Sequence, residues 1–140
     1  MEDLINKIKS QITLSAKAEE YLLSISIEKD IPKGTVLIRE GQAVNKIFFV
    51  KSGCLRSYCI DKEGKEHTLL FAIKDWWISD YIAIHDNEYA TLTVESLTDA
   101  TVIEFNAKKL NEIHDLFPEF EPLQRRNLER HVVSLQKRIL

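Results

Sequence analysis

A chain of 140 residues with 44% hydrophobic residues is the size of one domain, and its net charge of −3 indicates no strong electrostatic bias towards nucleic acid. No apolar run approaches the ~20 residues of a membrane span, and the acidic N-terminus differs from a signal peptide. The composition therefore predicts a cytoplasmic protein. Two cysteines, Cys54 and Cys59, lie five residues apart in one predicted strand, so we expect both to be reduced and unpaired.

The first segment, residues 1–24, has the pattern of two short helices. Leu4, Ile5, Ile8 and Ile12 recur at helical spacing. Ser15 is a favourable N-cap for a second helix, because its hydroxyl can accept a hydrogen bond from a backbone N–H of the first turn.

Short β-rich runs alternate with turn residues over the second segment, residues 25–105. All four glycines of the chain lie between these runs, where turns with positive φ require them. Several short strands at close spacing predict an antiparallel roll or barrel. The expected strands cover residues 35–38, 46–50, 54–60, 67–72, 91–95 and 101–105.

The third segment, residues 106–140, has the pattern of two helices. Asn106 is a favourable N-cap for the first helix, and Pro118 is expected to open a longer second one. Apolar residues in the second helix step by four, three and four, which is the pattern of helices that pair lengthwise. The expected dimer interface consists of Leu128, Val132, Leu135 and Ile139.

Residues 76–92 contain the polar groups of an anion-binding turn. Ser79, Asp80 and Tyr81 lie near a predicted strand-to-helix turn, where exposed N–H groups can bind a charged ligand. A ribose-phosphate site needs a carboxylate for the sugar hydroxyls and an arginine that pairs with two phosphate oxygens. Asp80 is the strongest single candidate for a ligand contact.

The order and spacing of these features resemble the cyclic-nucleotide-binding domain of the Crp/Fnr transcription regulators. Residues 64–140 can be laid on that domain without a gap, and the turns Pro-Lys-Gly-Thr, Glu-Gly-Gln, Lys-Ser-Gly and Glu-Gly-Lys-Glu are similar to those of the family's eight-stranded β-roll. The resemblance implies one domain of mainly β structure with flanking helices (α+β), an antiparallel β-roll or jelly roll, and a long C-terminal dimerisation helix. The DNA-binding winged helix is expected to lie outside these 140 residues.

The resemblance also implies a ligand site with two departures from the family pattern. The family's Gly-Glu and Arg-Ser pairs correspond to Ser79-Asp80 and Ala90-Thr91, so the phosphate-binding arginine is replaced by Ala90. The base-contacting positions of the final helix include His131 and Leu135. The candidate ligand-binding residues are therefore Leu70, Trp76, Trp77, Ser79, Asp80, Tyr81, Ala90, Thr91, His131 and Leu135.

Several of these residues also have a purely structural interpretation. Asp80 could cap a short helix that begins at Tyr81 as readily as bind a ligand. Trp76 and Trp77 point to opposite faces of a strand, and packing is the favoured role over an aromatic wall for a ligand. His131 is more easily explained as a satisfied histidine than as a ligand contact, and Leu135 as part of the dimer interface.

The sequence contains no pattern that indicates catalysis or metal binding. No two histidines are spaced to place their imidazoles on one face. The iron–sulfur members of the family that the chain resembles carry a cluster of N-terminal cysteines, and this sequence has no cysteine before Cys54. We therefore expect a protein that is not an enzyme and has no metal or other cofactor.

Two functions remain open at this point. The first is the effector-sensing and dimerising part of a Crp/Fnr-like regulator, which binds cyclic AMP weakly or not at all and reaches DNA only through a C-terminal domain outside these residues. The second is a ligand-free structural or protein-interaction module built on the same roll. In either case we expect a homodimer formed through the final helix and no contact with membranes.

Overall fold

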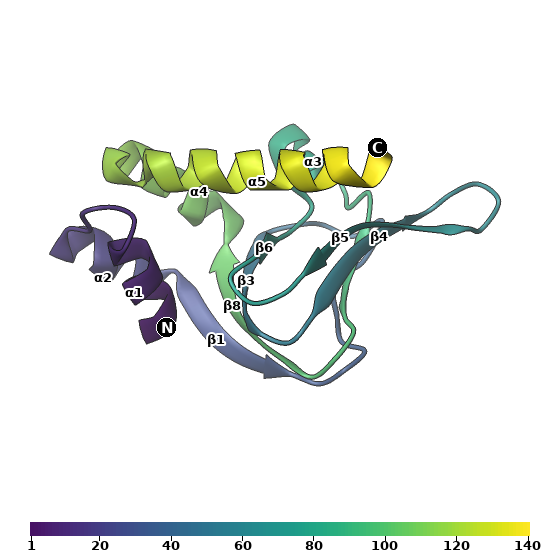
Figure 1. Ribbon diagram of the computed structural model, residues 1–140, viewed down its shortest axis with the longest axis horizontal. Helices are drawn as coiled ribbons and strands as arrows, with labels where there is room; N and C mark the ends of the chain where they lie inside the picture. The colour runs from purple at the N-terminus through teal and green to yellow at the C-terminus, as the bar shows by residue number, and fades with distance from the viewer.

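The N-terminal segment folds into two short helices, as the apolar spacing predicts. The computed structural model describes residues 1–140, and its first helices are α1 (Glu2–Lys9) and α2 (Ala16–Ser24). The Ser15 hydroxyl accepts a hydrogen bond from the Ala18 N–H at 3.2 Å, which confirms Ser15 as the N-cap of α2. Leu4, Ile8 and Leu22 are buried, so both helices turn their apolar face towards the strands (Figure 1).

Eight antiparallel strands follow and form two four-stranded sheets, which confirms the predicted mainly β fold with flanking helices. One sheet has the order β1-β8-β3-β6 and the other β2-β7-β4-β5. The strand bounds are β1 (Ser26–Ile31), β2 (Val36–Ile38), β3 (Lys46–Ser52), β4 (Leu55–Ile60), β5 (Glu66–Ala72), β6 (Trp77–Ile78), β7 (Thr93–Ser96) and β8 (Ala100–Asn106).

Three strand predictions differ from the structure. β1 and β6 were not expected, because β1 is an edge strand rich in charged residues and β6 has only two residues. The strand expected at 91–95 begins at Thr93 instead. Thr91, the first residue of the expected strand, does not pair with a neighbouring strand, because its N–H donates to the carboxylate of Asp80.

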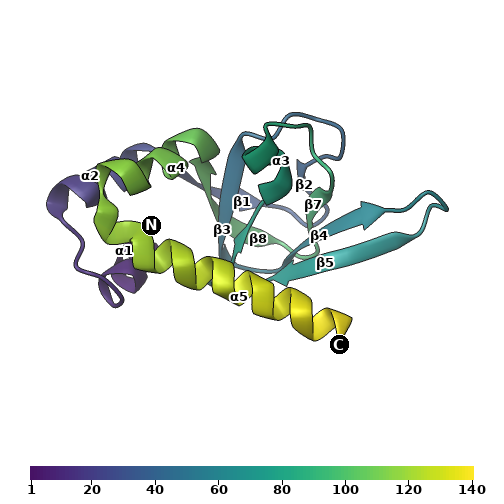
Figure 2. The ribbon, with the colours of Figure 1, turned by 90° about the horizontal axis from the view of Figure 1, so that it is seen from above.

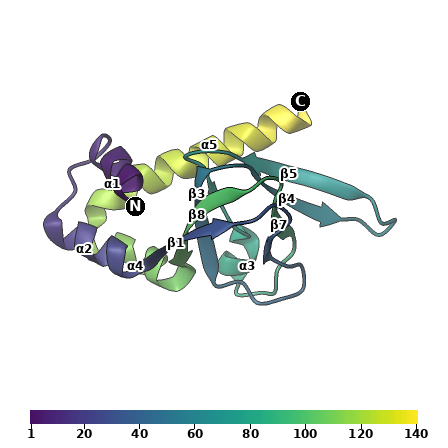
Figure 3. The same cartoon turned by 90° about the horizontal axis from the view of Figure 1, so that it is seen from below.

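The first sheet is covered on both faces, so its central strand β3 belongs to two cores. Phe48 packs between the sheets, whereas its neighbour Phe49 packs against the helices. The core between the sheets includes Phe48, Val50, Leu55, Val94 and Val102. The helix-side core includes Leu4, Leu22, Phe49, Phe105 and Phe120. The views from above and below show α1 and α2 at one end of the roll and the long C-terminal helix running along its side (Figures 2 and 3).

The C-terminal segment contains two helices separated by a short 3₁₀ turn. The Asn106 side chain accepts a hydrogen bond from the Lys109 N–H at 3.0 Å and caps α4 (Ala107–Leu116), as predicted. Pro118 does not open the long helix directly. It begins the turn η1 (Pro118–Phe120), and α5 (Glu121–Ile139) follows. The break lies at Phe117, whose extended backbone (φ −135°, ψ 84°) is the conformation that a following proline favours.

Helix α5 extends from the N-terminal helices across to the β4–β5 hairpin (Figures 1 and 2). It has no buried residue of its own. Its hydrogen bonds to the roll join the side chains of Arg130, His131 and Arg138 to backbone carbonyls. None of the helices combines the length and apolar character needed to cross a membrane.

Candidate functional site

Asp80 lies at the centre of the segment that the sequence identifies as the ligand site. Its side chain is 1% exposed. One carboxylate oxygen accepts a hydrogen bond from the Ala83 N–H at 3.1 Å and caps α3 (Tyr81–Asp86). The other accepts from the Thr91 N–H at 2.6 Å and from the Thr91 hydroxyl at 3.0 Å. The two polar residues retained from the family pattern therefore bind each other.

The residues around this pair are also engaged within the protein. The Ser79 hydroxyl donates to the Lys46 carbonyl at 2.7 Å. Ala90 is 5% exposed and Leu70 8% exposed, and both belong to the core between the sheets. Where the family has an arginine for a phosphate, the methyl group of Ala90 thus contributes to the apolar core.

The two tryptophans point to opposite faces of the sheet, as predicted. Trp76 packs against the core between the sheets, and Trp77 packs against the helix-side core. The Trp77 ring lies 5.1 Å from the Phe49 ring and 5.2 Å from the Phe105 ring, measured between centroids. The Arg130 guanidinium covers the Trp76 ring at 3.6 Å, a cation–π contact that the sequence did not reveal.

His131 joins helix α5 to the roll through its two ring nitrogens. Nδ1 lies 2.8 Å from the Asn127 carbonyl, and Nε2 lies 2.9 Å from the Trp77 carbonyl. The imidazole also makes edge contacts with the rings of Trp76 and Tyr81, at centroid distances of 5.4 and 5.6 Å. Both nitrogens therefore face backbone acceptors, which matches the structural interpretation of this histidine.

The apolar residues predicted to form a dimer interface remain exposed on α5. The exposed fractions are 50% for Leu128, 62% for Val132, 41% for Leu135 and 84% for Ile139. Three residues after Leu135, Arg138 donates to the Thr68 carbonyl at 2.9 Å. Helix α5 thus has one side joined to the roll by polar contacts and an uncovered apolar stripe.

Tyr81 follows Asp80 in sequence, but its side chain lies on the helix side of the first sheet. Its hydroxyl is buried without a hydrogen-bond partner, and burial raises the pKa of the phenol to about 12. The residue lines a pocket shared by α1, α4, α5 and the outer face of the sheet. Sequence reasoning missed this pocket, because its residues come from distant segments with no common motif.

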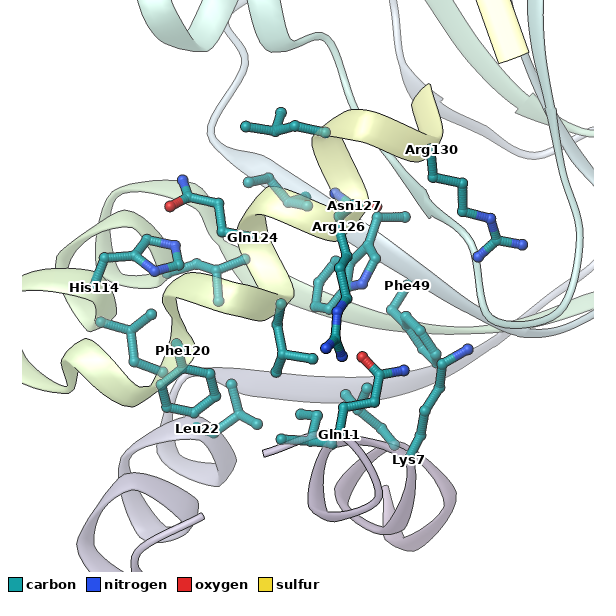
Figure 4. Close-up of a pocket in the computed structure, with 18 of the residues that line it drawn as sticks. Lys7, Gln11, Leu22, Phe49, His114, Phe120, Gln124, Arg126, Asn127 and Arg130 are labelled. Carbon is teal, nitrogen blue, oxygen red and sulfur yellow. The ribbon is translucent and has the colours of Figure 1, made fainter. Parts of the chain in front are cut away.

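The pocket has a volume of about 280 Å³ and is separate from the Asp80–Thr91 pair. Figure 4 shows its residues converging from the N-terminal helices, the sheet and α5. His114 also lines it, and the buried Nδ1 atom of this residue has no hydrogen-bond partner. No group of three or more His, Cys, Asp or Glu side chains is arranged to hold a metal ion.

The chain is similar to known proteins in both sequence and fold. The family model for the cyclic nucleotide-binding domain matches residues 28–116. The "Transcriptional activator protein FnrA" of Stutzerimonas stutzeri is 25% identical over 112 residues, which cover 80% of this chain and 45% of that protein. The "Anaerobic regulatory protein" of Bacillus subtilis is 27% identical over 97 residues, which cover 69% of this chain and 41% of that protein.

A solved structure shares the fold over nearly the whole chain. The sensor domain of the transcriptional regulator DNR from Pseudomonas aeruginosa superposes with a TM-score of 0.68 at 22% identity, covering 90% of this chain and 82% of that one. The chain spans less than half the length of the curated relatives named above. With the family model matching most of its length and the regulators sharing its sequence and fold, the chain belongs to the cyclic nucleotide-binding domain family, in its Crp/Fnr branch.

Proposed function

We propose that this chain is the effector-sensing and dimerising part of a Crp/Fnr-type transcription regulator, and that cyclic AMP is not its effector. The observation that supports the second half is the closed pair of Asp80 and Thr91. All three hydrogen bonds at the Asp80 carboxylate come from within the chain. The carboxylate is 1% exposed, so a ribose hydroxyl could reach it only if the surrounding residues moved.

Electrostatics support the same conclusion. The family's arginine forms two charge-assisted hydrogen bonds to a cyclic phosphate. In this chain Ala90 occupies the position of that arginine and is buried in the core. Loss of a charge-assisted contact costs about 1.5 to 3 kcal/mol, or roughly tenfold to more than a hundredfold in affinity. Thr91 cannot compensate, since its N–H and hydroxyl already donate to Asp80.

Isothermal titration calorimetry with cyclic AMP tests this part of the proposal. We expect no saturable heat up to about 1 mM ligand, which corresponds to a binding free energy weaker than about −4 kcal/mol. A dissociation constant in the micromolar range or tighter would overturn it. If binding is found, Asp80→Asn distinguishes a ribose contact from binding elsewhere, since only the former depends on that carboxylate.

The dimerisation part rests on the exposed apolar stripe of α5. Leu128, Val132, Leu135 and Ile139 lie on one side of a helix with no buried residue, and apolar seams of this spacing pair lengthwise. The partner is a second copy of this chain. DNA would be reached only through a further domain, and the proposed role involves no catalysis, metal or other cofactor.

Sedimentation equilibrium tests the dimer. We expect a dimer that dissociates in the double variant Val132→Glu, Leu135→Glu. The matched control is Gln136→Glu with Lys137→Gln, which changes the charge of α5 by the same −2 at exposed positions outside the stripe. A wild-type monomer, or equal dissociation of both double variants, would contradict the assigned interface.

A ligand-free interaction module is the second candidate, and one observation favours it. Three of the polar side chains expected to bind a nucleotide are already hydrogen-bonded within the chain, namely Ser79, Asp80 and Thr91. Native mass spectrometry of freshly purified protein separates the two candidates. A retained small molecule supports the sensor, whereas a bare dimer that stays bare across effector screens supports the module.

A further inference from the structure

The pocket on the helix side of the first sheet has the features of a second ligand site. It is lined by 21 residues, 12 of them hydrophobic, and lies between α1, α4, the first half of α5 and the outer face of the sheet. Asp80, Ala90 and Thr91 are not among these residues. Any ligand bound here would therefore contact the N-terminal helices and α5 at once, as Figure 4 makes visible.

The walls of the pocket are apolar and partly aromatic. The lining includes Leu4 and Ile8 of α1, Phe49 and Trp77 of the sheet, and Phe120 before α5. An apolar cavity of about 150 Å³ holds one benzene molecule. The volume of about 280 Å³ is nearly twice as large. It therefore fits a body of two fused rings or a medium-length acyl chain.

Two buried polar atoms in these walls have no partner within the protein. They are the Tyr81 hydroxyl and the Nδ1 atom of His114. A buried polar group left unpaired is unfavourable, so such groups call for a partner. Burial raises the pKa of Tyr81 to about 12, with Asn127 partly offsetting the rise, so the phenol keeps its proton and can donate to a ligand oxygen. Although Asn127 is near, it forms no hydrogen bond with the Tyr81 hydroxyl.

The charges around the pocket favour an anion. Lys7, Arg126 and Arg130 line it together with one acid, Asp75. Lys7 is paired with Asp75 at 3.3 Å, and Arg130 covers the Trp76 ring while donating to the Asp75 carbonyl at 3.2 Å. Arg126 forms no ion pair or hydrogen bond and extends from α5 towards α1 (Figure 4). A free guanidinium beside an apolar cavity can pair with both oxygens of a carboxylate.

We propose that this pocket binds a small amphiphilic carboxylate, with its apolar body between α1 and the sheet, its carboxylate paired with Arg126 and an oxygen accepting from the Tyr81 hydroxyl. The inference deepens the proposed sensing function and rests on it for the consequence of binding. That consequence is a change in how α5 lies on the roll. Binding itself can be measured independently of any sensing role.

The test uses 2-naphthoate as the probe and its neutral amide, 2-naphthamide, as the matched ligand. Calorimetric titration of the full chain should show naphthoate binding more tightly than the amide by about tenfold, the contribution of one charge-assisted pair at a partly exposed site. Arg126→Gln should abolish that difference. Arg125→Gln is the control, because the adjacent Arg125 does not line the pocket and is 3.9 Å from Glu121. It should leave both affinities unchanged.

Two further variants locate the ligand. Tyr81→Phe should weaken naphthoate binding several-fold without changing the fold, since only the buried hydroxyl is removed. Leu123→Trp should fill the pocket and prevent binding of both probes. No binding of naphthoate at millimolar concentration, or equal affinities for both probes that Arg126→Gln leaves unchanged, overturns the site. Sedimentation with and without naphthoate then tests sensing separately, because it measures whether the ligand changes the α5 dimer. A failed titration would overturn the pocket but would leave the proposed α5 dimer standing.

Discussion

The substitution Asp80→Ala tests whether the carboxylate at the centre of the expected nucleotide site serves the fold. It deletes the acceptor of three hydrogen bonds at a position that is 1% exposed. The N–H groups of Ala83 and Thr91 would then be left without a partner. Because a small cavity replaces the carboxylate, water can satisfy them only in part.

The expected loss of stability follows from these contacts. Removing an N-cap costs about 0.5 to 2 kcal/mol. Hydrogen bonds to a charged group contribute about 1.5 to 3 kcal/mol each, and the two from Thr91 share one oxygen, so they do not add fully. We expect Asp80→Ala to lower the free energy of unfolding by about 3 to 5 kcal/mol. That is a large part of the 5 to 15 kcal/mol, roughly, of a typical domain.

Urea unfolding followed by tryptophan fluorescence measures this loss in the free energy of unfolding. The protein concentration must be the same for all variants, because self-association adds to the apparent stability. Thr91→Val keeps the backbone bond and removes only the hydroxyl, so it should cost about 1 to 2 kcal/mol. Asp86→Ala, an exposed acid on the same helix, should stay within about 0.5 kcal/mol of wild type. A loss below about 1 kcal/mol for Asp80→Ala would refute the structural role and reopen the carboxylate as a ligand contact.

Two other predictions concern backbone strain and pH. Gly53→Ala should cost about 2 to 4 kcal/mol in unfolding experiments, because φ is +89° and a Cβ would lie 2.5 Å from the Asp99 carbonyl oxygen. Gly64→Ala, with φ +84° and no atom within 4 Å, should cost only about 1 to 2 kcal/mol, and equal losses would contradict the steric part. Burial lowers the pKa of His114, with Asp115 opposing, so the unfolded chain protonates before the folded one and stability should fall as the pH drops below about 6.5. His114→Leu should flatten this fall, and an unchanged pH profile would show that His114 does not cause it.

The sequence predicted those parts of the fold that depend on local patterns. Ser15 and Asn106 cap helices as expected, and four glycines in turns have positive φ. The alternation of Phe48 and Phe49 between two cores could not be predicted, since a strand buried on both faces shows no alternation of polar and apolar residues. Strand β1 was missed for the opposite reason, because half of its residues are charged and most are exposed, as an edge strand allows.

The candidate site was predicted only as a set of residues, without the bonds between them. Spacing identified Asp80 and Thr91, but whether a carboxylate faces a ligand or a neighbour depends on a few ångströms of backbone placement. The pocket around Tyr81 was beyond sequence reasoning altogether. Its lining joins Lys7 of the first helix to Arg126 of the last, and nothing in a single sequence records that these residues meet.

Helix α5 is attached to the roll near its middle and near its C-terminal end. His131 meets the Trp77 carbonyl near the middle of α5, and Arg138 meets the Thr68 carbonyl one residue before the helix ends. A helix rises about 1.5 Å per residue, so the arm beyond His131 is about 12 Å long, and a tilt of about 5° about this fulcrum moves its tip by about 1 Å. That displacement is enough to break the 2.9 Å bond of Arg138. A small tilt of α5 would thus make or break one hydrogen bond, the one from Arg138 to the Thr68 carbonyl.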